Sequence, residues 1–558
     1  MEKRNKTALI VSFLIVLVAV LVVDVSFLKI TYYSEFDMFG PLSKYPLILL
    51  AQFSLPILFM MILLKRRETS PIILLIPFIL LITIKYVGVE LADAFYITSF
   101  YDSPGHFKKG LYVTVAGQSN PKIDSYFDLQ PAFFWVTAML FNICGAPKSF
   151  ADLSSILIIK WFPIFAVTVY IPILYLFYKR LLGKPLLVST ALFLNFGMEI
   201  IHYHYAAETY GRAVYWFLLT TIFYFMKRRD PRCLILALLA GFSLIFLHEG
   251  LLILTLLAFI ALVIYPAPFR VLSTARNRFF HKEFFTLPIT LGVTWFSYLI
   301  YLTLYQFKTV VLTIQRVIET LIMENVQIIP SGITRPYVDW EQIVFYKVIY
   351  ILVLVASGLI LSFVNAYRKR DEADKLAFSI VLLSATFFGG AAITLGGAGY
   401  IERLPSAISP ILVYSMVEYA SSLKLREPRK VTSLLVAVPL IVLIFTGSAF
   451  YMSGRNFQSI TYGEYYSTVF LVNKDPQNIM GIYSGLKVTS VRDVINAELE
   501  NKSTSQITAI SIDRYKITET YYYTCANMSL INASIRKLQQ EMAVIYSNPD
   551  AVMLLRNR

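Results

Sequence analysis

Long apolar runs separated by short polar segments dominate the hydropathy pattern of this chain. Many of the runs have about 17–25 residues, which is the length that an α-helix needs to cross a bilayer. Apolar residues are continuous within each run and do not alternate with polar ones, so a transmembrane β-barrel is not expected. The pattern predicts an α-helical polytopic membrane protein.

Composition and charge agree with this class. The chain has 558 residues, of which 57% are hydrophobic, and a mean hydropathy of +0.64. The net charge of +15 does not indicate nucleic-acid binding, because Lys and Arg cluster in short segments between the apolar runs. We therefore expect membrane lipids, and no nucleic acid, among the partners. Cys144, Cys233 and Cys525 are too widely spaced to suggest a disulfide framework or a metal knuckle.

The basic segments orient the apolar runs. MEKRNK at the N-terminus is predicted to be cytoplasmic, and the first run is too long for a signal-peptide core, so we expect a retained helix. Alternation of sides then predicts a multi-pass protein of the cell membrane with about 13 spans and an external C-terminus. The predicted spans are Thr7–Lys29, Tyr45–Leu64, Pro71–Glu90, Leu153–Tyr178, 184–200, 212–226, 232–247, 250–266, 286–305, 344–367, 374–395, 405–422 and 431–450.

One apolar run does not fit the alternation. If Pro131–Cys144 crossed the membrane, the next span would place its terminal basic segment, YKRLLGK, outside. The run has about 14 residues, fewer than the roughly 20 that a span needs. We therefore expect it to lie along the outer surface or to re-enter the membrane. A short tilted span that violates the positive-inside rule is the alternative.

These assignments divide the chain into two domains. Residues 1–450 form the predicted transmembrane domain, with large external loops at 89–152 and 306–343. In the second loop, TVVLTIQRVIETLIM has the apolar spacing of a helix that lies on the membrane surface. Residues 451–558 are more polar and predict a small external α/β domain.

The predicted C-terminal domain has recognisable local patterns. SQITAISIDR predicts a strand, EMAVIYSNPDAVMLLR predicts a hairpin that turns at Asn548-Pro549-Asp550, and RDVINAEL predicts a short helix. Three N-glycosylation sequons, at Asn501, Asn527 and Asn532, agree with an external position. Together with the absence of a disulfide framework, they suggest an archaeal cell envelope.

Ionisable residues gather at the predicted outer ends of the helices. Four of the five histidines (His106, His202, His204 and His248) lie in or beside outer loops. Charged groups at membrane depth are costly and tend to mark functional cavities. This distribution predicts a polar cavity that opens away from the cytoplasm.

Three stretches within residues 85–270 carry a resemblance to a known family. They are YDSPGHFKKGLYVTVAGQ; FDLQPAFFWVTAMLFNICGAPKSFADLSSILIIKWFPIFAVTVYIPILYLFYKRLLG; and LNFGMEIIHYHYAAETYGRAVYWFLLTTIFYFMKRR with GFSLIFLHEGLLILTLLAF. The chain resembles the GT-C superfamily of membrane glycosyltransferases, which includes protein O-mannosyltransferases, lipid A aminoarabinose transferases and oligosaccharyltransferases. Three predicted helices precede the large outer loop here, where the family usually has one.

The resemblance implies an activity. Enzymes of this superfamily transfer a sugar from a polyprenyl-phosphate or polyprenyl-diphosphate carrier on the outer face, usually with inversion. The implied acceptor is a lipid, a glycan or a protein. An acid in the first large outer loop activates or positions that acceptor, and Asp102 matches it best by position.

Two acids and one His are the candidates for proton chemistry. Asp102 would act as general base, and Asp93 is the second candidate. Alternatively, Asp102 only caps a helix that starts near Pro104, because Asp-Ser-Pro is typical of a helix N-terminus. His106, four residues later, would share a helical face with Asp102 and orient it or bind a metal; an interfacial His without a role is the alternative.

Cations suit the leaving phosphate. Arg212 and Arg403 are the first candidates, because guanidinium groups bind phosphate through a fork of donors, and Lys85 and Lys108 follow. Glu208 stands four residues before Arg212, which is also the spacing of a simple helical ion pair. His202 and Glu208 are compatible with a divalent cation, Mg²⁺ or Mn²⁺, held together with Asp102.

Alternatives remain open for one residue and for the function. His248, with Glu249, interrupts two apolar runs, and either forms a simple turn or belongs to the cavity wall. A transporter or lipid flippase is the alternative function, and it predicts ionisable residues at all depths together with inverted repeats. A non-catalytic scaffold would make Asp102 dispensable.

Overall fold

The structure is a computed structural model, and most of the residues that it describes are helical. It describes residues 2–23, 46–66, 70–88, 96–98, 102–118, 130–143, 153–200, 203, 205–265, 284–303, 311–312, 315, 338–369, 371–395, 398–422, 442–450, 460–461, 488–490, 509–513, 533, 535–537, 539–540, 543–547 and 551–555. The bundle helices are α1 (Glu2–Val23), α3 (Pro46–Arg66), α4 (Pro71–Ile82), α9 (Leu153–Leu182), α10 (Pro185–Met198), α11 (Ala207–Arg228), α12 (Pro231–Leu247), α13 (Glu249–Ile264), α15 (Thr286–Leu302), α17 (Val338–Lys369), α18 (Glu372–Leu395) and α19 (Ala398–Ser422).

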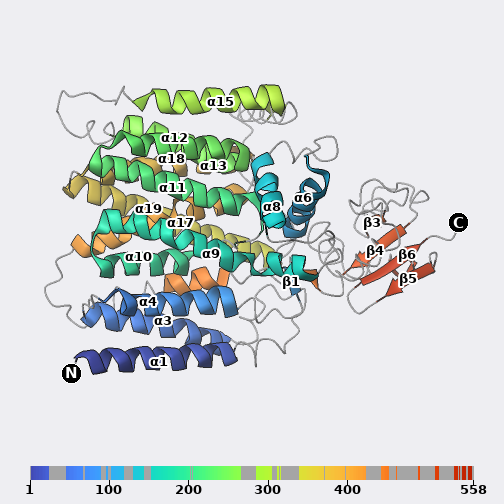
Figure 1. Cartoon of the computed structure of the whole chain (residues 1–558), viewed down its shortest axis with the longest axis horizontal. Coiled ribbons are helices and arrows are strands. Elements are labelled where there is room, and N and C mark those ends of the chain that lie inside the picture. Colours follow the sequence, from blue (N-terminus) through green and yellow to red (C-terminus); the bar gives the residue numbers. More distant parts are fainter. Residues whose placement is uncertain are drawn as a thin grey trace.

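The bundle is consistent with a helical membrane protein. Figure 1 shows its long helices running nearly parallel. Within the described residues, four helices are long and apolar enough to cross a membrane: Pro46–Lys65, Lys160–Leu182, Phe345–Lys369 and Glu372–Gly390. Large apolar side chains are exposed on the bundle flanks, among them Ile15 at 65% and Ile360 at 62%, as expected for lipid-facing positions. The total of thirteen spans stays a prediction.

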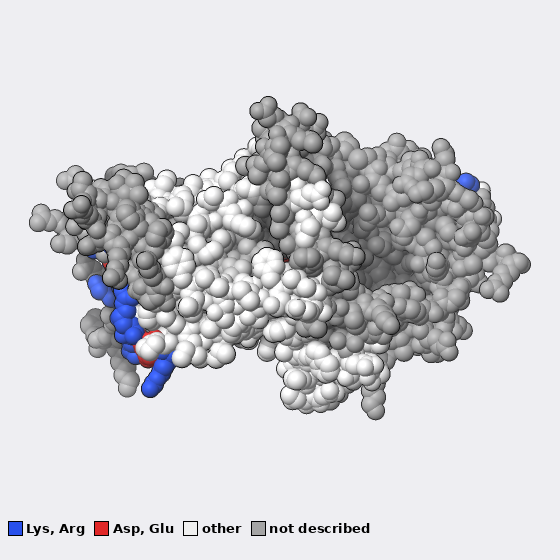
Figure 2. Space-filling model, turned by 90° about the horizontal axis from the view of Figure 1, so that it is seen from above, with Lys and Arg blue, Asp and Glu red and all other residues white. Residues whose placement is uncertain are grey.

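Described Lys and Arg side chains gather at one end of the bundle. Figure 1 places the N-terminus at one end and the C-terminal strands at the other, and Figure 2 shows Lys and Arg gathered at the N-terminal end. We name this the basic end and its opposite the sheet end. At the basic end α9 stops before Gly183, which has a positive φ of 71°, and α11 stops before Arg229, at φ 57°.

Ion pairs connect three segments at the basic end. Lys227, at the end of α11, pairs with Asp371, and the neighbouring Arg229 pairs with Glu372 at the start of α18. Lys369 at the end of α17 pairs with Glu418 on α19. Basic segments that the sequence assigns to two separate cytoplasmic turns therefore lie together in the fold.

The Lys227–Asp371 pair makes stability depend on pH. Burial raises the pKa of Asp371, but hydrogen bonds from Lys227 and from the Ala373 N–H outweigh it and hold the pKa below the ordinary value. The stabilisation is complete above the unfolded pKa of about 3.9 and is lost as pH falls through the lower folded pKa. We expect the loss of stability below about pH 4 to be smaller in Asp371→Asn than in the wild type, measured by thermal unfolding. Identical acid profiles would contradict this contribution.

Two short helices lie across the sheet end of the bundle. α6 (Asp102–Ala116) and α8 (Pro131–Ile143) pack against each other there, at an angle to the long helices (Figure 1). α6 stops before Gly117, whose φ is +67° and whose N–H bonds to the Val113 carbonyl. The length and orientation of α8 agree with a segment that does not span.

The described strands form two small sheets. β1 (Tyr96–Thr98) pairs antiparallel with β2 (Ile460–Thr461). The second sheet has the order β3-β4-β6-β5, with β3 parallel to β4 and the other pairs antiparallel. Its strands are β3 (Val488–Ser490), β4 (Ala509–Asp513), β5 (Ala543–Ser547) and β6 (Ala551–Leu555).

The second sheet matches part of the prediction for the C-terminal region. β4 lies within SQITAISIDR, and β5 and β6 form the hairpin expected from EMAVIYSNPDAVMLLR. The helix predicted for RDVINAEL and the sequon residues Asn501, Asn527 and Asn532 lie outside the described residues. The extent of the domain and its external position therefore stay predictions.

Candidate functional site

Four charged residues meet at the sheet end of the bundle. Lys85 lies in the π-helical segment η2 (Thr83–Gly88) after α4, Glu199 directly follows α10, and Glu208 and Arg212 belong to the first turns of α11. We name these four residues the ionic centre. Lys85, Glu199 and Arg212 are 0%, 3% and 2% exposed. Buried charges are stable only when they are paired and hydrogen-bonded, so the contacts within the centre decide its role.

Arg212 contacts both carboxylates. Its Nη2 donates to Glu208 Oε1 at 2.9 Å, and its Nη1 lies 3.9 Å from Glu199 Oε1. The guanidinium also lies over the Tyr203 ring, 5.3 Å from the centroid, in a cation–π contact. The predicted i,i+4 pair between Glu208 and Arg212 is confirmed.

Lys85 holds the end of α10. Its Nζ donates to the carbonyl oxygens of Phe196 at 2.8 Å, Gly197 at 3.4 Å and Glu199 at 2.5 Å. The last carbonyls of a helix have no partner within the helix, and a cation there also complements the helix dipole. The ammonium therefore fixes the place where α10 stops and the chain turns toward α11.

Tyr203 joins the two halves of the ionic centre. Its hydroxyl donates to Glu199 Oε2 at 3.2 Å, and its ring stacks on Tyr86 with centroids 5.6 Å apart. Burial, and next the Glu199 carboxylate, raise the pKa of the Tyr203 phenol well above its ordinary value, so the hydroxyl stays protonated and remains a donor. Lys85, Tyr203 and Arg212 therefore hold the connection between α10 and α11 at its start, in its middle and at its end.

An aromatic seam connects α6 and α8 to the start of α11. Phe107 of α6 lies 6.1 Å from the Tyr205 ring, and Phe133 of α8 lies 5.4 Å from Tyr205 and 5.3 Å from Tyr210. Phe162 of α9 contacts the same two tyrosines. Since Tyr205 and Tyr210 flank Glu208 in the chain, the helix that begins at Asp102 packs next to the ionic centre.

The seam requires a glycine where α6 meets α8. A Cβ added at Gly110 would lie 2.3 Å from Thr137 Cγ2, and Thr137 is held because its Oγ1 accepts a hydrogen bond from the Tyr205 hydroxyl at 2.6 Å. We expect Gly110→Ala to lower the free energy of unfolding by about 1–3 kcal/mol, measured by titration with SDS in mixed micelles. Gly292→Ala in α15 is the control, because nothing lies within 4 Å of its added Cβ. Equal losses in the two variants would contradict the close contact.

The candidates for proton chemistry are described only in part. Asp102 is the first residue of α6, but its side chain, like all of Asp93, lies outside the described residues. The His106 ring packs edge-on against Phe133, with centroids 5.5 Å apart, and lies 6.2 Å from Phe134. Both of these contacts join α6 to α8.

The other predicted residues lie at separate positions. Lys108 belongs to α6 and Arg403 to α19, which begins earlier than predicted, so Arg403 is inside a helix; both side chains lie outside the described residues. His202 also lies outside them. No group of three His, Cys, Asp or Glu residues suited to a metal occurs in the part of the chain that the structure describes.

His248 acts as a helix cap. It separates α12 from α13, and its Nδ1 accepts a hydrogen bond from the Leu251 N–H at 3.3 Å. Gly211 of α11 packs against this turn, since an added Cβ would lie 3.1 Å from His248 Cβ. The geometry matches the simple-turn interpretation, while a position in a cavity wall stays a prediction.

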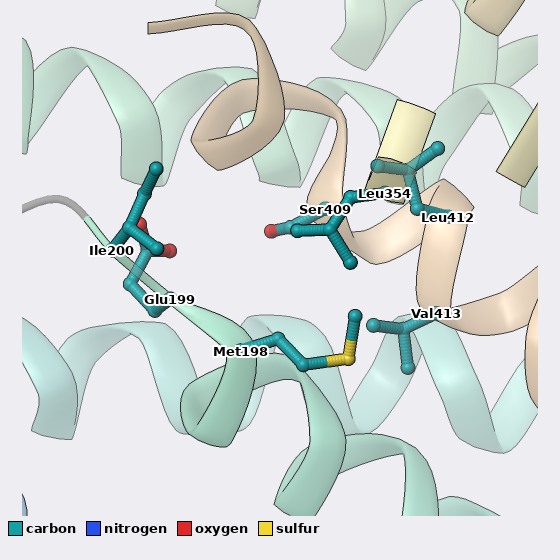
Figure 3. A pocket seen from close by; sticks show the side chains of 7 residues that line it. All are labelled: Met198, Glu199, Ile200, Leu354, Ser409, Leu412 and Val413. Atoms are coloured by element: carbon teal, nitrogen blue, oxygen red, sulfur yellow. The ribbon is translucent and has the colours of Figure 1, made fainter. Parts of the chain in front are cut away.

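A small cavity adjoins Glu199. Its volume is about 20 Å³, and its lining residues are Met198, Glu199, Ile200, Leu354, Ser409, Leu412 and Val413. Figure 3 shows Glu199 and Ile200 on one side of it, opposite Leu412 and Val413. The space suffices for one water molecule and is far below the roughly 300–1,000 Å³ of a ligand pocket. It does not hold a sugar.

Sequence reasoning missed Glu199. The signal was present, because Glu199 ends the apolar stretch LNFGM and is itself followed by Ile200 and Ile201. A carboxylate at that depth requires a partner. Tyr203 stands four residues after Glu199, but Arg212 lies across the turn between α10 and α11, so no helical spacing predicts the contact with Arg212.

Comparisons with known proteins leave the family open. No protein-family model matches the chain, and no curated protein matches it.

Proposed function

We propose that this chain is a GT-C-type glycosyltransferase that transfers a sugar from a polyprenyl-phosphate carrier to an acceptor hydroxyl on the external face of the membrane. The observation that carries the proposal is the position of α6. The helix that begins at Asp102 packs through the aromatic seam beside the ionic centre, at the end of the bundle opposite the basic residues. By the positive-inside rule the sheet end is then the external one.

The topology belongs to the same proposal. Thirteen spans put the N-terminus in the cytoplasm and residues 451–558 outside as a small α/β domain. The two termini lie at opposite ends of the bundle, which supports an odd number of crossings (Figure 1).

Asp102 supplies the base in the proposed reaction. The acceptor hydroxyl attacks the anomeric carbon and loses its proton to the Asp102 carboxylate, while the bond from that carbon to the carrier phosphate breaks. The phosphate departs with the bonding electron pair, and a single displacement inverts the anomeric configuration. Lys108 and Arg403 are the proposed partners of the departing phosphate, since cations stabilise that charge.

The ionic centre has a positioning role in this proposal. Lys85 and Arg212 are buried and already engaged by carbonyl and carboxylate oxygens, which favours holding the α10–α11 connection over binding a phosphate. His202 belongs to that connection, and Asp93 precedes α6 in the sequence. Both residues stay candidates for the site. Glu208 forms an ion pair with Arg212, and the proposed reaction does not use a divalent cation.

The positions of buried charges favour an enzyme over a transporter. Among the described residues, Lys85, Lys160, Glu199 and Arg212 are buried near the sheet-end termini of their segments, and Asp374 is buried in the first turn of α18. A transport path would instead require ionisable groups along the depth of the bundle.

Identification of the bound lipid tests the function. We expect a polyprenyl-phosphate-linked sugar to co-purify with the full chain in mild detergent and to be found by mass spectrometry of the extracted lipid. Asp102→Asn should retain it, because Asp102 acts on the acceptor. The same lipid in equal amount on an unrelated polytopic protein, or none on this chain, would contradict the proposal.

A further inference from the structure

Several cations at the basic end have no carboxylate within ion-pair distance in the described part of the chain. They lie where α9 meets α10 and where α11 meets α12, and they are Lys179, Arg180, Lys184, Arg228 and Arg232. The neighbouring Lys227 and Arg229, by contrast, are paired with Asp371 and Glu372. The two turns therefore present positive charge that the described residues do not neutralise.

Two of these cations converge from different helices. The Arg180 guanidinium, at the end of α9, lies 5.2 Å from the ring centroid of Tyr224 on α11. Arg228 follows Tyr224 by four residues and so lies on the same face of α11. Cys233, in the first turn of α12, is within electrostatic range of both Arg180 and Arg228. Asp230, the N-cap of α12, is also within electrostatic range of Cys233, so a single carboxylate faces the two guanidinium groups. A bound anion would relieve the repulsion that remains between them.

The surface next to this pair is apolar and exposed. On α9, Tyr175 and Leu176 are 42% and 45% exposed, and Phe217 on α11 is 39% exposed. On α12, Leu236 and Leu239 are 44% and 55% exposed. All five lie within about three helical turns of the two cations, toward the middle of the bundle. An anion with long apolar chains would contact both the cations and the exposed apolar side chains, whereas a free phosphate would contact only the cations.

We propose that Arg180 and Arg228 bind the phosphate head group of an anionic membrane lipid whose acyl chains lie along α9, α11 and α12. Guanidinium groups offer phosphate two parallel donors, and basic pockets between helices at the cytoplasmic side of membrane proteins recognise anionic head groups in this way. The site lies at the end opposite α6, so it does not depend on the proposed glycosyl transfer.

Native mass spectrometry of the full chain tests the site. The detergent-purified protein is titrated with phosphatidylglycerol, and with phosphatidylcholine as the zwitterionic comparison. We expect Arg180→Gln with Arg228→Gln to weaken phosphatidylglycerol binding about 30-fold, since each of the two cations near an anionic head group contributes about 1 kcal/mol. Phosphatidylcholine binding should not change.

A second pair of substitutions distinguishes lipid binding at this site from a general effect of surface charge. Lys65 and Arg368 also end helices at the basic end, and Lys65→Gln with Arg368→Gln removes the same charge elsewhere. Equal weakening by both double variants, or by neither, would overturn the proposal. Should the Gln pair not fold, Arg180→Lys with Arg228→Lys keeps the charge but loses the forked donors. An affinity equal to the wild type in that variant would also overturn it.

Discussion

Replacing Arg212 with Met is expected to lower the free energy of unfolding by about 3 kcal/mol or more. Met fills a similar volume, so the loss reflects charge rather than a cavity. Without the guanidinium, Glu199 and Glu208 lose the cation that both contact, at 3.9 Å and 2.9 Å. Glu199 is 3% exposed and is not rescued by solvent. Unfolding is measured by titration with SDS in mixed micelles, from the full chain.

Two further variants test whether the loss of stability comes from the buried charges. Arg229→Met removes the same side chain from the half-exposed pair with Glu372 at the basic end and should cost at most about 1 kcal/mol. Adding Glu199→Gln to Arg212→Met should recover part of the loss, because the amide replaces a buried carboxylate whose guanidinium contact has been removed. If Arg212→Met and Arg229→Met cost the same, the ionic centre is not the buried network described above.

Replacing Asp102 with Asn is expected to reduce sugar transfer by at least about 100-fold, because a general base contributes roughly 10²–10⁴-fold to such a step. Asn caps a helix about as well as Asp does, so this variant would preserve a cap at the start of α6 and remove only the base. Initial rates with the co-purified lipid-linked sugar as donor measure the effect. The unfolding free energy should stay within about 0.5 kcal/mol of the wild type.

A second acid serves as the control for Asp102. Asp124 lies in the same predicted external loop, and Asp124→Asn should leave the rate unchanged. Full transfer by Asp102→Asn would remove this residue from the mechanism and favour the capping or scaffold alternatives. A loss of rate that follows a loss of folded protein would assign Asp102 a structural role.

Much of the bundle follows from patterns within single segments. Basic residues at 179–180 and 227–229 mark helix ends correctly, and the length of Pro131–Ile143 agrees with a helix that does not span. The end of α6 at Gly117 and the hairpin of β5 and β6 also follow from local chemistry. Each of these features depends on residues that are close in sequence.

The remainder depends on contacts between distant segments. Apolar length predicts a helix to residue 90, but not the π-helical turn that carries Lys85 or the three carbonyls it contacts more than 100 residues later. The Glu208–Arg212 pair follows from i,i+4 spacing, whereas the approach of Glu199 to Arg212 requires the turn between α10 and α11. Residue type and predicted outer position assigned Lys85 and Arg212 to a phosphate, whereas the contacts of the two side chains in the fold favour a positioning role.

Chemical labelling in intact cells tests whether the end of the bundle that carries α6 is external. Ser103→Cys places a thiol beside Asp102, and Cys144 and Cys525 are replaced with Ser to remove other thiols predicted to be external. We expect a membrane-impermeant maleimide to label Ser103→Cys before lysis and to label Ser273→Cys, in a predicted cytoplasmic turn, only afterwards. Labelling of Ser103→Cys only after lysis would contradict the external position and the reaction built on it.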